Sequence, residues 1–195
     1  IPANTRFMTM DGAVDVLKQE KASDRINFET IYYMYTNNDV EALSKTEVAN
    51  EEKELNSGVK WISFKQKFFS YALISKESFD DAFIELHTKS RPSNKRYQKS
   101  MSAVIDVPFD GLNEDNKIEM SYYFGPNNFK VLKQYDMNLE DQIPLGGKLV
   151  SWINKLIVIN VFDWLGHYGW SYGVVILVLT LIIKLCLMPI AFKSY

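Results

Sequence analysis

The sequence predicts a mainly β fold: an antiparallel β-sandwich, followed by an amphipathic interfacial helix and one transmembrane α-helix. Three observations predict this order. Short segments rich in β-branched and aromatic residues alternate with turn residues through the first 125 positions, as in antiparallel sandwiches. An amphipathic segment comes next, and a run of 23 residues with a single charge follows it. The charges divide in the same way, because residues 144–195 carry +3 while residues 1–143 carry −5, for a total of −2.

The predicted strands follow one another with turn residues between them. Ile26–Tyr35 begins with strict alternation of apolar and polar side chains. Val59–Ser75 is predicted as two strands that turn near Gln66, and further strands are expected at Ser78–His87, Met101–Val107 and Lys117–Phe124. Asn, Asp, Gly and Pro fill the spacers. Many short strands with such spacers favour an antiparallel sandwich.

The hydrophobic period changes after Gly125. Pro126 suits the first turn of a helix, and apolar residues then recur at helical spacing, so a short helix is expected near 126–135. A polar linker, Asp136–Gln142, leads to Pro144. The predicted domain boundary lies there, with residues 1–143 forming an aqueous domain.

Residues 144–169 are predicted to form an amphipathic helix and a loop at a membrane interface. Twelve of the eighteen residues from Lys148 to Leu165 are apolar, and most of the polar ones gather on one side at about 100° per residue. Lysines combined with tryptophans are typical of interfacial helices. The alternatives are a buried helix of a soluble core, or a first span that forms a hairpin with the next segment. The predicted interface residues are Lys148, Trp152, Lys155, Trp164 and Trp170.

Residues 170–193 are predicted to cross the membrane. The run from Trp170 to Phe192 would reach about 34 Å as a helix, which exceeds a hydrocarbon layer of about 30 Å. Trp170 and Tyr172 occupy one end, where an aromatic belt is expected. Lys193 follows the other end and favours a cytoplasmic location for it.

Lys184 is the charge within this run. A lysine at the centre of a span costs about 2.5–3.5 kcal/mol, so it usually faces protein or water. At helical spacing it shares a side with small and polar residues, including Gly173 and Thr180, which suits a bundle interior or a wet recess. The opposite side, which includes Val175 and Leu179, is expected to face lipid. Snorkelling of the lysine to the headgroups is the alternative, and helical geometry leaves the two about even.

Other signatures are scarce. His87 and His167 belong to no metal-ligand spacing, and no nucleophile or phosphate-loop motif is present, so no catalytic residue, metal or cofactor is expected. Glu47–Glu54 is interpreted as a solvated acidic loop. The mildly acidic domain argues against nucleic acid, and Cys186 is the only cysteine, so no intrachain disulfide can form. Both ends of the sequence are interpreted as cut from a longer protein.

Four strings of the sequence carry a family resemblance when taken together: Trp61–Ile74 (WISFKQKFFSYALI), Tyr122–Pro126 (YYFGP), Trp152–Leu165, and Gly173–Tyr195 (GVVILVLTLIIKLCLMPIAFKSY). They resemble the YidC family of membrane protein insertases, in particular the bacterial members with a large periplasmic domain. The last string has the family's pattern of an aliphatic span, a basic residue, a proline about one turn later and a short polar exit.

The resemblance implies a fold and a mechanism. It implies a mutarotase-like β-supersandwich portion, an interfacial helix and a helical core with a positively charged groove. Lys184 matches the groove position that is usually arginine, and Thr180 is a weaker candidate for lining the groove. The implied partners are nascent membrane proteins, the Sec translocon with its accessory subunits, and the lipid bilayer. The implied location is the bacterial inner membrane, with residues 1–143 in the periplasm.

Two other functions stay open at this point. The β-sandwich type shared with mutarotases permits a membrane-anchored domain that binds or modifies sugars. A bitopic scaffold, in which the sandwich docks a partner and the helix is only an anchor, is the second alternative. The insertase reading itself predicts no covalent chemistry.

Overall fold

The structure, a computed structural model, describes residues 7–17, 29–43, 50–79, 81–88, 97–108, 119–146, 151, 154–167 and 169–193. The chain divides into two compact units, Ile1–Ile143 and Pro144–Tyr195. The first unit is built of β-sheets, and the second contains helices α3 and α4.

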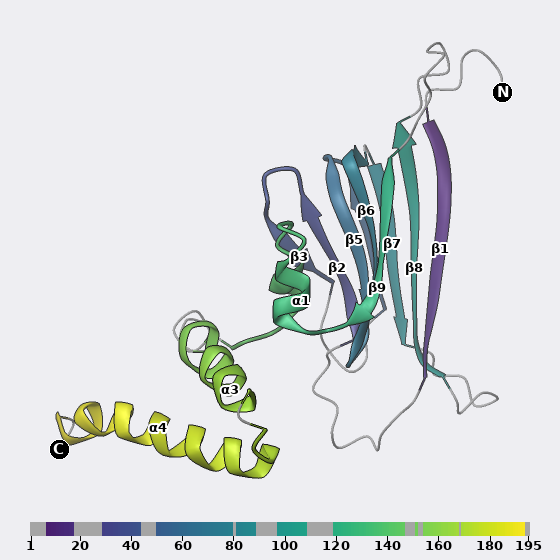
Figure 1. Cartoon of the computed structure of the whole chain (residues 1–195). Helices are drawn as coiled ribbons and strands as arrows, with labels where there is room; N and C mark the ends of the chain where they lie inside the picture. Colours follow the sequence, from purple (N-terminus) through teal and green to yellow (C-terminus); the bar gives the residue numbers. More distant parts are fainter. Residues whose placement is uncertain are drawn as a thin grey trace. The chain divides into compact units, whose positions relative to one another are not determined.

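Two antiparallel sheets make up the first unit (Figure 1). The five-stranded sheet has the order β3-β2-β5-β6-β9, with β2 at Thr30–Tyr35, β3 at Val40–Ala42, β5 at Val59–Lys65, β6 at Phe69–Phe79 and β9 at Met120–Pro126. The four-stranded sheet has the order β1-β8-β7-β4, with β1 at Phe7–Leu17, β8 at Tyr97–Pro108, β7 at Asp81–Thr88 and β4 at Asn50–Leu55. The prediction of a mainly antiparallel β fold is confirmed.

The core between the sheets explains the alternation along the strands. Ile31 and Tyr33 on β2 are buried in this core, together with Ile62 on β5 and Ile84 on β7. The intervening side chains point to the other face of the five-stranded sheet, as expected for a side-chain period of two. They are buried as well, and they include both apolar residues such as Trp61 and polar ones such as Ser63 and Lys65.

A second core covers that outer face. Helix α1 (Phe129–Lys133) and the 3₁₀ helix η2 (Leu139–Gln142) bury Leu132 and Leu139 against Trp61 and its neighbours. Figure 1 shows α1 lying against this sheet. The interpretation of residues 136–142 as a polar linker was therefore wrong, because Leu139 and Gln142 are buried.

Helix α1 is also shorter than predicted. Pro126 ends strand β9 instead of opening the helix. Asn128 caps α1, and its side chain accepts hydrogen bonds from the backbone N–H groups of Lys130 and Val131. Asparagine at this position satisfies N–H groups that have no partner within the helix, so the helix starts after it.

The predicted strands agree with the structure where a clear turn separates one strand from the next. Strands β5 and β6 turn at Gln66, where the backbone N–H donates to Phe69 O at 2.9 Å, as predicted. Strands β1 and β3 were not predicted. The interpretation of Glu47–Glu54 as a solvated loop was wrong for its described part, because Asn50–Leu55 forms edge strand β4. An edge strand can keep charged side chains on its solvent face, so its acidic composition concealed it.

The second unit is helical in its described part. A π-helical turn at Asn154–Val158 leads into α3 (Ile159–Gly166), and α4 spans Tyr172–Lys193. Helices α3 and α4 pack together, and Leu165, Val175 and Leu179 are buried. The expectation that Val175 and Leu179 face lipid is therefore wrong in this structure. Among the described residues, no helix meets the combined length and apolarity of a membrane-crossing helix. The predicted span is not confirmed and stays a prediction.

Candidate functional site: helix α4 and a cleft between the sheets

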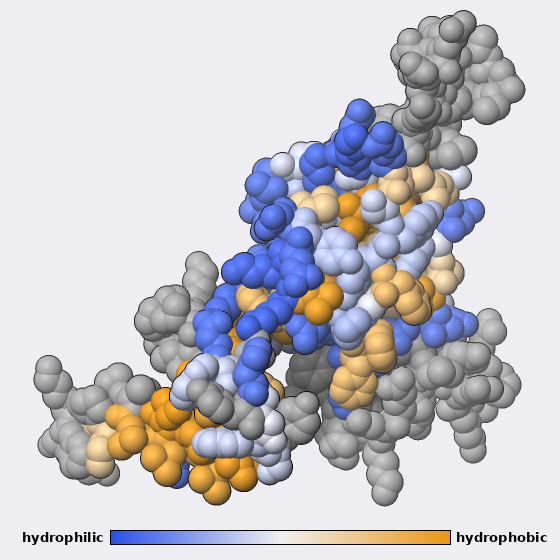
Figure 2. Space-filling model, in the orientation of Figure 1, coloured by the Kyte–Doolittle hydropathy of each residue, from blue (hydrophilic) through white to orange (hydrophobic). Residues whose placement is uncertain are grey.

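The two predicted groove residues lie one turn apart on α4, and both are exposed. Thr180 Oγ1 donates a hydrogen bond to Ile176 O at 2.7 Å, so its proton is used within the helix. Lys184 follows four residues later and shares the same helix face. Figure 2 shows hydrophobic surface along this helix. The exposed large apolar residues of α4 are Val174, Ile176, Leu177, Leu181, Leu185 and Met188.

The predicted interface residues are only partly described. Lys155 is exposed on the π-helical turn, and the side chains of Trp164 and Trp170 are 58% and 48% exposed. Trp164 lies on α3 and Trp170 lies just before α4. Half-exposed tryptophans have the amphipathic setting that membrane interfaces favour. Lys148 and Trp152 lie outside the described residues.

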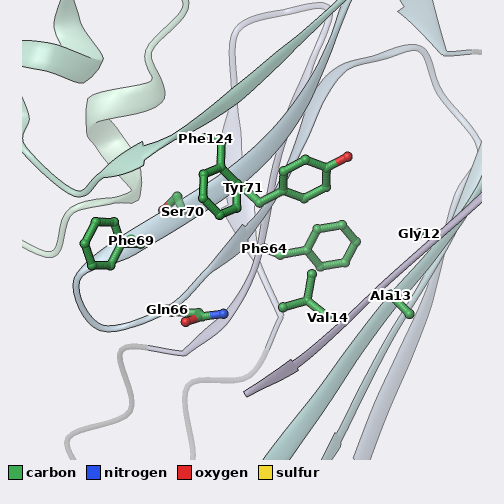
Figure 3. Close-up of a pocket in the computed structure, with 9 residues that line it drawn as sticks. All are labelled: Gly12, Ala13, Val14, Phe64, Gln66, Phe69, Ser70, Tyr71 and Phe124. Atoms are coloured by element: carbon green, nitrogen blue, oxygen red, sulfur yellow. The ribbon is translucent and has the colours of Figure 1, made fainter. Parts of the chain in front are cut away.

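A cleft of about 570 Å³ opens between the two sheets of the first unit (Figure 3). Gly12, Ala13 and Val14 of β1 form one wall. An ideal Cβ on Gly12 would lie 3.8 Å from the Phe64 ring, so the glycine keeps this wall one side chain further back. The other walls come from strands β5, β6 and β9 and the turn after β5: Phe64, Gln66, Phe69, Ser70, Tyr71 and Phe124.

Aromatic rings dominate the five-stranded side of the cleft. Phe64 and Tyr71 stack with ring centroids 6.0 Å apart, and Tyr71 stacks on Tyr122 at the same distance. Phe124 lies 6.2 Å from Tyr71 in a tilted arrangement. Burial raises the pKa of Tyr71, with a smaller contribution from Tyr122, so this phenol stays neutral at physiological pH.

The lining of the cleft suits contact with an apolar group. Its described lining residues include no carboxylate, histidine or cysteine. Across the described part of the chain, no cluster of three or more His, Cys, Asp or Glu side chains could hold a metal ion. Stacked rings beside one amide and two hydroxyls offer dispersion to an apolar group and a few hydrogen bonds to a polar atom on it.

A polar cluster joins the sheets at another edge. Lys53 Nζ donates to Tyr33 Oη at 2.6 Å and to Glu41 Oε2 at 2.9 Å. Tyr33 Oη in turn donates to Glu41 Oε2 at 2.8 Å. The hydrogen bond from Lys53 holds the pKa of Glu41 below its usual value, helped by the one from Tyr33. The charges of Lys53 and Glu41 pair with each other, so we interpret this cluster as a contact that stabilises the fold.

A second polar group is buried beneath η2. Ser63 Oγ donates to Gln142 Oε1 at 2.8 Å, and Ser70 Oγ lies 3.2 Å from the same oxygen. The Gln142 side chain is fully buried, and its Nε2 has no partner among the described residues. This amide anchors the end of η2 to the sheet. Trp61 Nε1 adds a second anchor by donating to Met137 O at 2.8 Å.

Sequence reasoning missed the cleft and both polar clusters. The cleft needs β1, which was not predicted, and the clusters join residues up to 79 positions apart. The sequence contained one signal that could have pointed to the cleft, because two adjacent phenylalanines, Phe68 and Phe69, stand at a predicted turn.

The described elements make this a protein with an antiparallel β-sandwich followed by a helical unit. The sequence model of the family described as YidC periplasmic domain matches residues 5–159. The chain therefore belongs to the YidC periplasmic domain family, and the resemblance inferred from the sequence is confirmed.

Three relatives show the extent of the similarity. The chain is 36% identical over 192 residues to the Membrane protein insertase YidC of Parabacteroides distasonis, which covers 93% of this chain and 29% of the relative. It is 36% identical over 202 residues to the protein of the same name from Bacteroides fragilis, covering 100% of this chain and 32% of the relative. The Porphyromonas gingivalis protein of this name is 29% identical over 203 residues, again with 100% and 32% coverage. The chain thus spans about a third of the length of these relatives.

Proposed function

We propose that this chain is part of a membrane protein insertase and chaperone of the bacterial inner membrane. The observation that carries the proposal is the family match over residues 5–159, together with relatives that are named membrane protein insertases. In this proposal residues 1–143 form the periplasmic β-sandwich portion. Residues 144–169 form the interfacial helix and loop, and residues 170–193 form the first span of the insertase core, with its C-terminal end in the cytoplasm.

Lys184 is the proposed functional residue. A lysine within the apolar run of α4 is costly in lipid unless it faces a wet recess or other helices. A positive recess attracts acidic segments of an incoming membrane protein and shortens the apolar path that they cross. Lysine keeps the charge of arginine but lacks its planar set of five donors. Thr180, one turn earlier, lines the same proposed recess.

The proposed partners follow from this mechanism. They are nascent membrane proteins, the lipid bilayer, and the Sec translocon with its accessory subunits. The interface residues Lys148, Trp152, Lys155, Trp164 and Trp170 would hold the second unit at the bilayer surface. The proposed mechanism involves no covalent step and no cofactor.

The test replaces Lys184 in the full-length protein. Lys184→Ala should reduce the insertion of substrates whose translocated segments are acidic, and Lys184→Arg should retain it. The matched control is Leu177→Ala, which changes an exposed apolar residue of the same helix. Wild-type insertion of acidic substrates by the Ala variant would contradict the groove role.

The family match does not favour the two alternatives. A sugar-active domain would need a positioned acid and base, and the described lining of the cleft holds no carboxylate or histidine. Saturable binding from a panel of sugars, with turnover, would restore that reading. The bitopic scaffold would apply only if this protein lacked the insertase activity for which its relatives are named.

A further inference from the structure

The turn between β5 and β6 presents two adjacent phenylalanines to solvent. Phe68 and Phe69 are each 55% exposed, although the strands on both sides of them are largely buried. Single exposed apolar side chains are common, whereas a group of exposed large apolar residues marks an interaction site.

Asn127 holds this turn in place. Its Nδ2 donates to Gln66 O at 2.7 Å and lies 3.4 Å from Lys67 O. Its backbone N–H donates to Phe68 O at 2.7 Å. The turn is therefore tied to the end of β9, so the exposed rings are held in position before any partner arrives. Binding through a preorganised surface loses less conformational entropy.

Strand β9 extends the apolar surface. Tyr122 and Phe124 are 56% and 82% exposed, and they lie two residues apart on one face of the strand. Phe124 is opposite Tyr71 in the sheet register, and Phe69 is opposite Pro126. The turn phenylalanines and the β9 rings thus lie at the same end of the five-stranded sheet. We call these residues the aromatic tip: Phe68, Phe69, Tyr122 and Phe124.

The charges near the aromatic tip differ in sign from those of the rest of the domain. Residues 61–75 and 120–135 contain four lysines and no acidic residue, whereas the rest of residues 1–143 contain 14 basic and 23 acidic residues. Lys65 is buried, whereas the other three lysines are half-buried or exposed. Lys67 Nζ lies 5.2 Å from the centroid of the Phe68 ring. A basic side chain beside an exposed aromatic ring is typical of surfaces that enter the headgroup region of anionic bilayers.

We propose that the aromatic tip is a membrane contact through which the β-sandwich rests on the surface of an anionic lipid bilayer. The rings enter the interfacial region, and Lys67 beside them meets the lipid phosphates. This inference rests on the proposed function, since it requires that the second unit hold the chain at a membrane. It adds a second membrane contact, on the domain that the family description calls periplasmic.

The experiment measures lipid contact at single positions in the full-length protein, reconstituted into phosphatidylethanolamine–phosphatidylglycerol vesicles. The background replaces Cys186 and any other cysteine of the full-length protein by serine, and an environment-sensitive fluorophore is attached at Phe68→Cys. The matched control is Glu52→Cys on the exposed face of β4, and Leu177→Cys reports on the predicted span. Lipids that carry a nitroxide near the headgroup, or deep in the chain, quench the fluorophore on contact.

We expect shallow nitroxides to quench the label at position 68 severalfold more than the label at position 52. Adding Lys67→Gln, or replacing phosphatidylglycerol by phosphatidylcholine, should reduce this quenching. Equal quenching at positions 68 and 52, with deep quenching at 177, overturns the membrane contact and leaves the proposed function intact. Loss of quenching at 177 instead contradicts the predicted span. A blue shift at position 68 with an unfolded polypeptide but not with vesicles assigns the tip to protein binding and also overturns the proposal.

Discussion

Lys53 Nζ lies 2.9 Å from Glu41 Oε2 and thereby connects β4 of the four-stranded sheet to β3 of the five-stranded sheet. Both strands are sheet edges, where backbone groups are left without ladder partners. The same ammonium group contacts Tyr33 Oη, which is held by a ring buried in the core. A surface ion pair is thus connected to a buried side chain.

Lys53→Met should lower the free energy of unfolding by about 1 kcal/mol, since it removes two hydrogen bonds at a partly exposed site. Urea unfolding in detergent, followed by near-UV circular dichroism, measures this difference. Glu52→Gln, on the solvent face of the same strand, should change the stability by less than about 0.5 kcal/mol. An equal loss in both variants would show that the inter-sheet contact adds nothing.

The stability of the domain should fall between pH 10 and pH 12 in part through Tyr33. Burial raises the pKa of Tyr33 to about 12, against an opposing effect of the Lys53 hydrogen bond. An unfolded tyrosine ionises near pH 10, so above about pH 10 the native state binds more protons than the unfolded state. The contribution is complete below that pH and is lost as the pH rises through the folded value.

Tyr33→Phe should reduce this pH dependence without removing it, because burial also raises the pKa values of Tyr71 and Tyr123. Unfolding titrations at pH 8, 10 and 11 compare the two proteins. An unchanged slope in the Phe variant would contradict the assignment to Tyr33.

Gln142→Ala should cost about 1–3 kcal/mol, because it leaves a buried serine hydroxyl without its acceptor. Gln134→Ala, at the exposed end of α1, is the control and should have an effect below about 0.5 kcal/mol. Thermal unfolding of both variants is the measurement. A small loss for Gln142→Ala would mean that water satisfies the hydroxyl equally well.

Asn128→Ala should destabilise the domain by about 1 kcal/mol through the loss of the α1 cap. Asn128→Asp should retain most of the stability, because a carboxylate accepts the same backbone hydrogen bonds. If the Asp variant were as unstable as the Ala variant, the asparagine would act through some other contact.

Thr180→Val should reduce the insertion of acidic substrates less than Lys184→Ala does. The Thr180 hydroxyl already donates to Ile176 O, so only its acceptor capacity is offered to a recess. Initial rates of insertion into proteoliposomes give the comparison. A greater loss in the Val variant would reverse the proposed order of importance.

The sequence by itself determined the elements that can be recognised from a short stretch of neighbouring residues. The turn at Gln66 was predictable because two strands rich in aromatic and β-branched residues flank it. The mainly β character of the domain and the family membership were predictable from residue patterns and strings. The start of α1 was misplaced because Pro126 is compatible with both a strand end and a helix start, and the Asn128 cap decided between them.

The tertiary structure alone decided which distant residues meet. Strand β4 is charged, and only its pairing with β7 makes it a strand. The buried Gln142 became an anchor because η2 folds back over the sheet to Ser63. The cleft and the aromatic tip depend on β1 and β9, which pair with strands far away in sequence. Sequence patterns report period and propensity along the chain, whereas strand order and burial depend on long-range contacts that no local window contains.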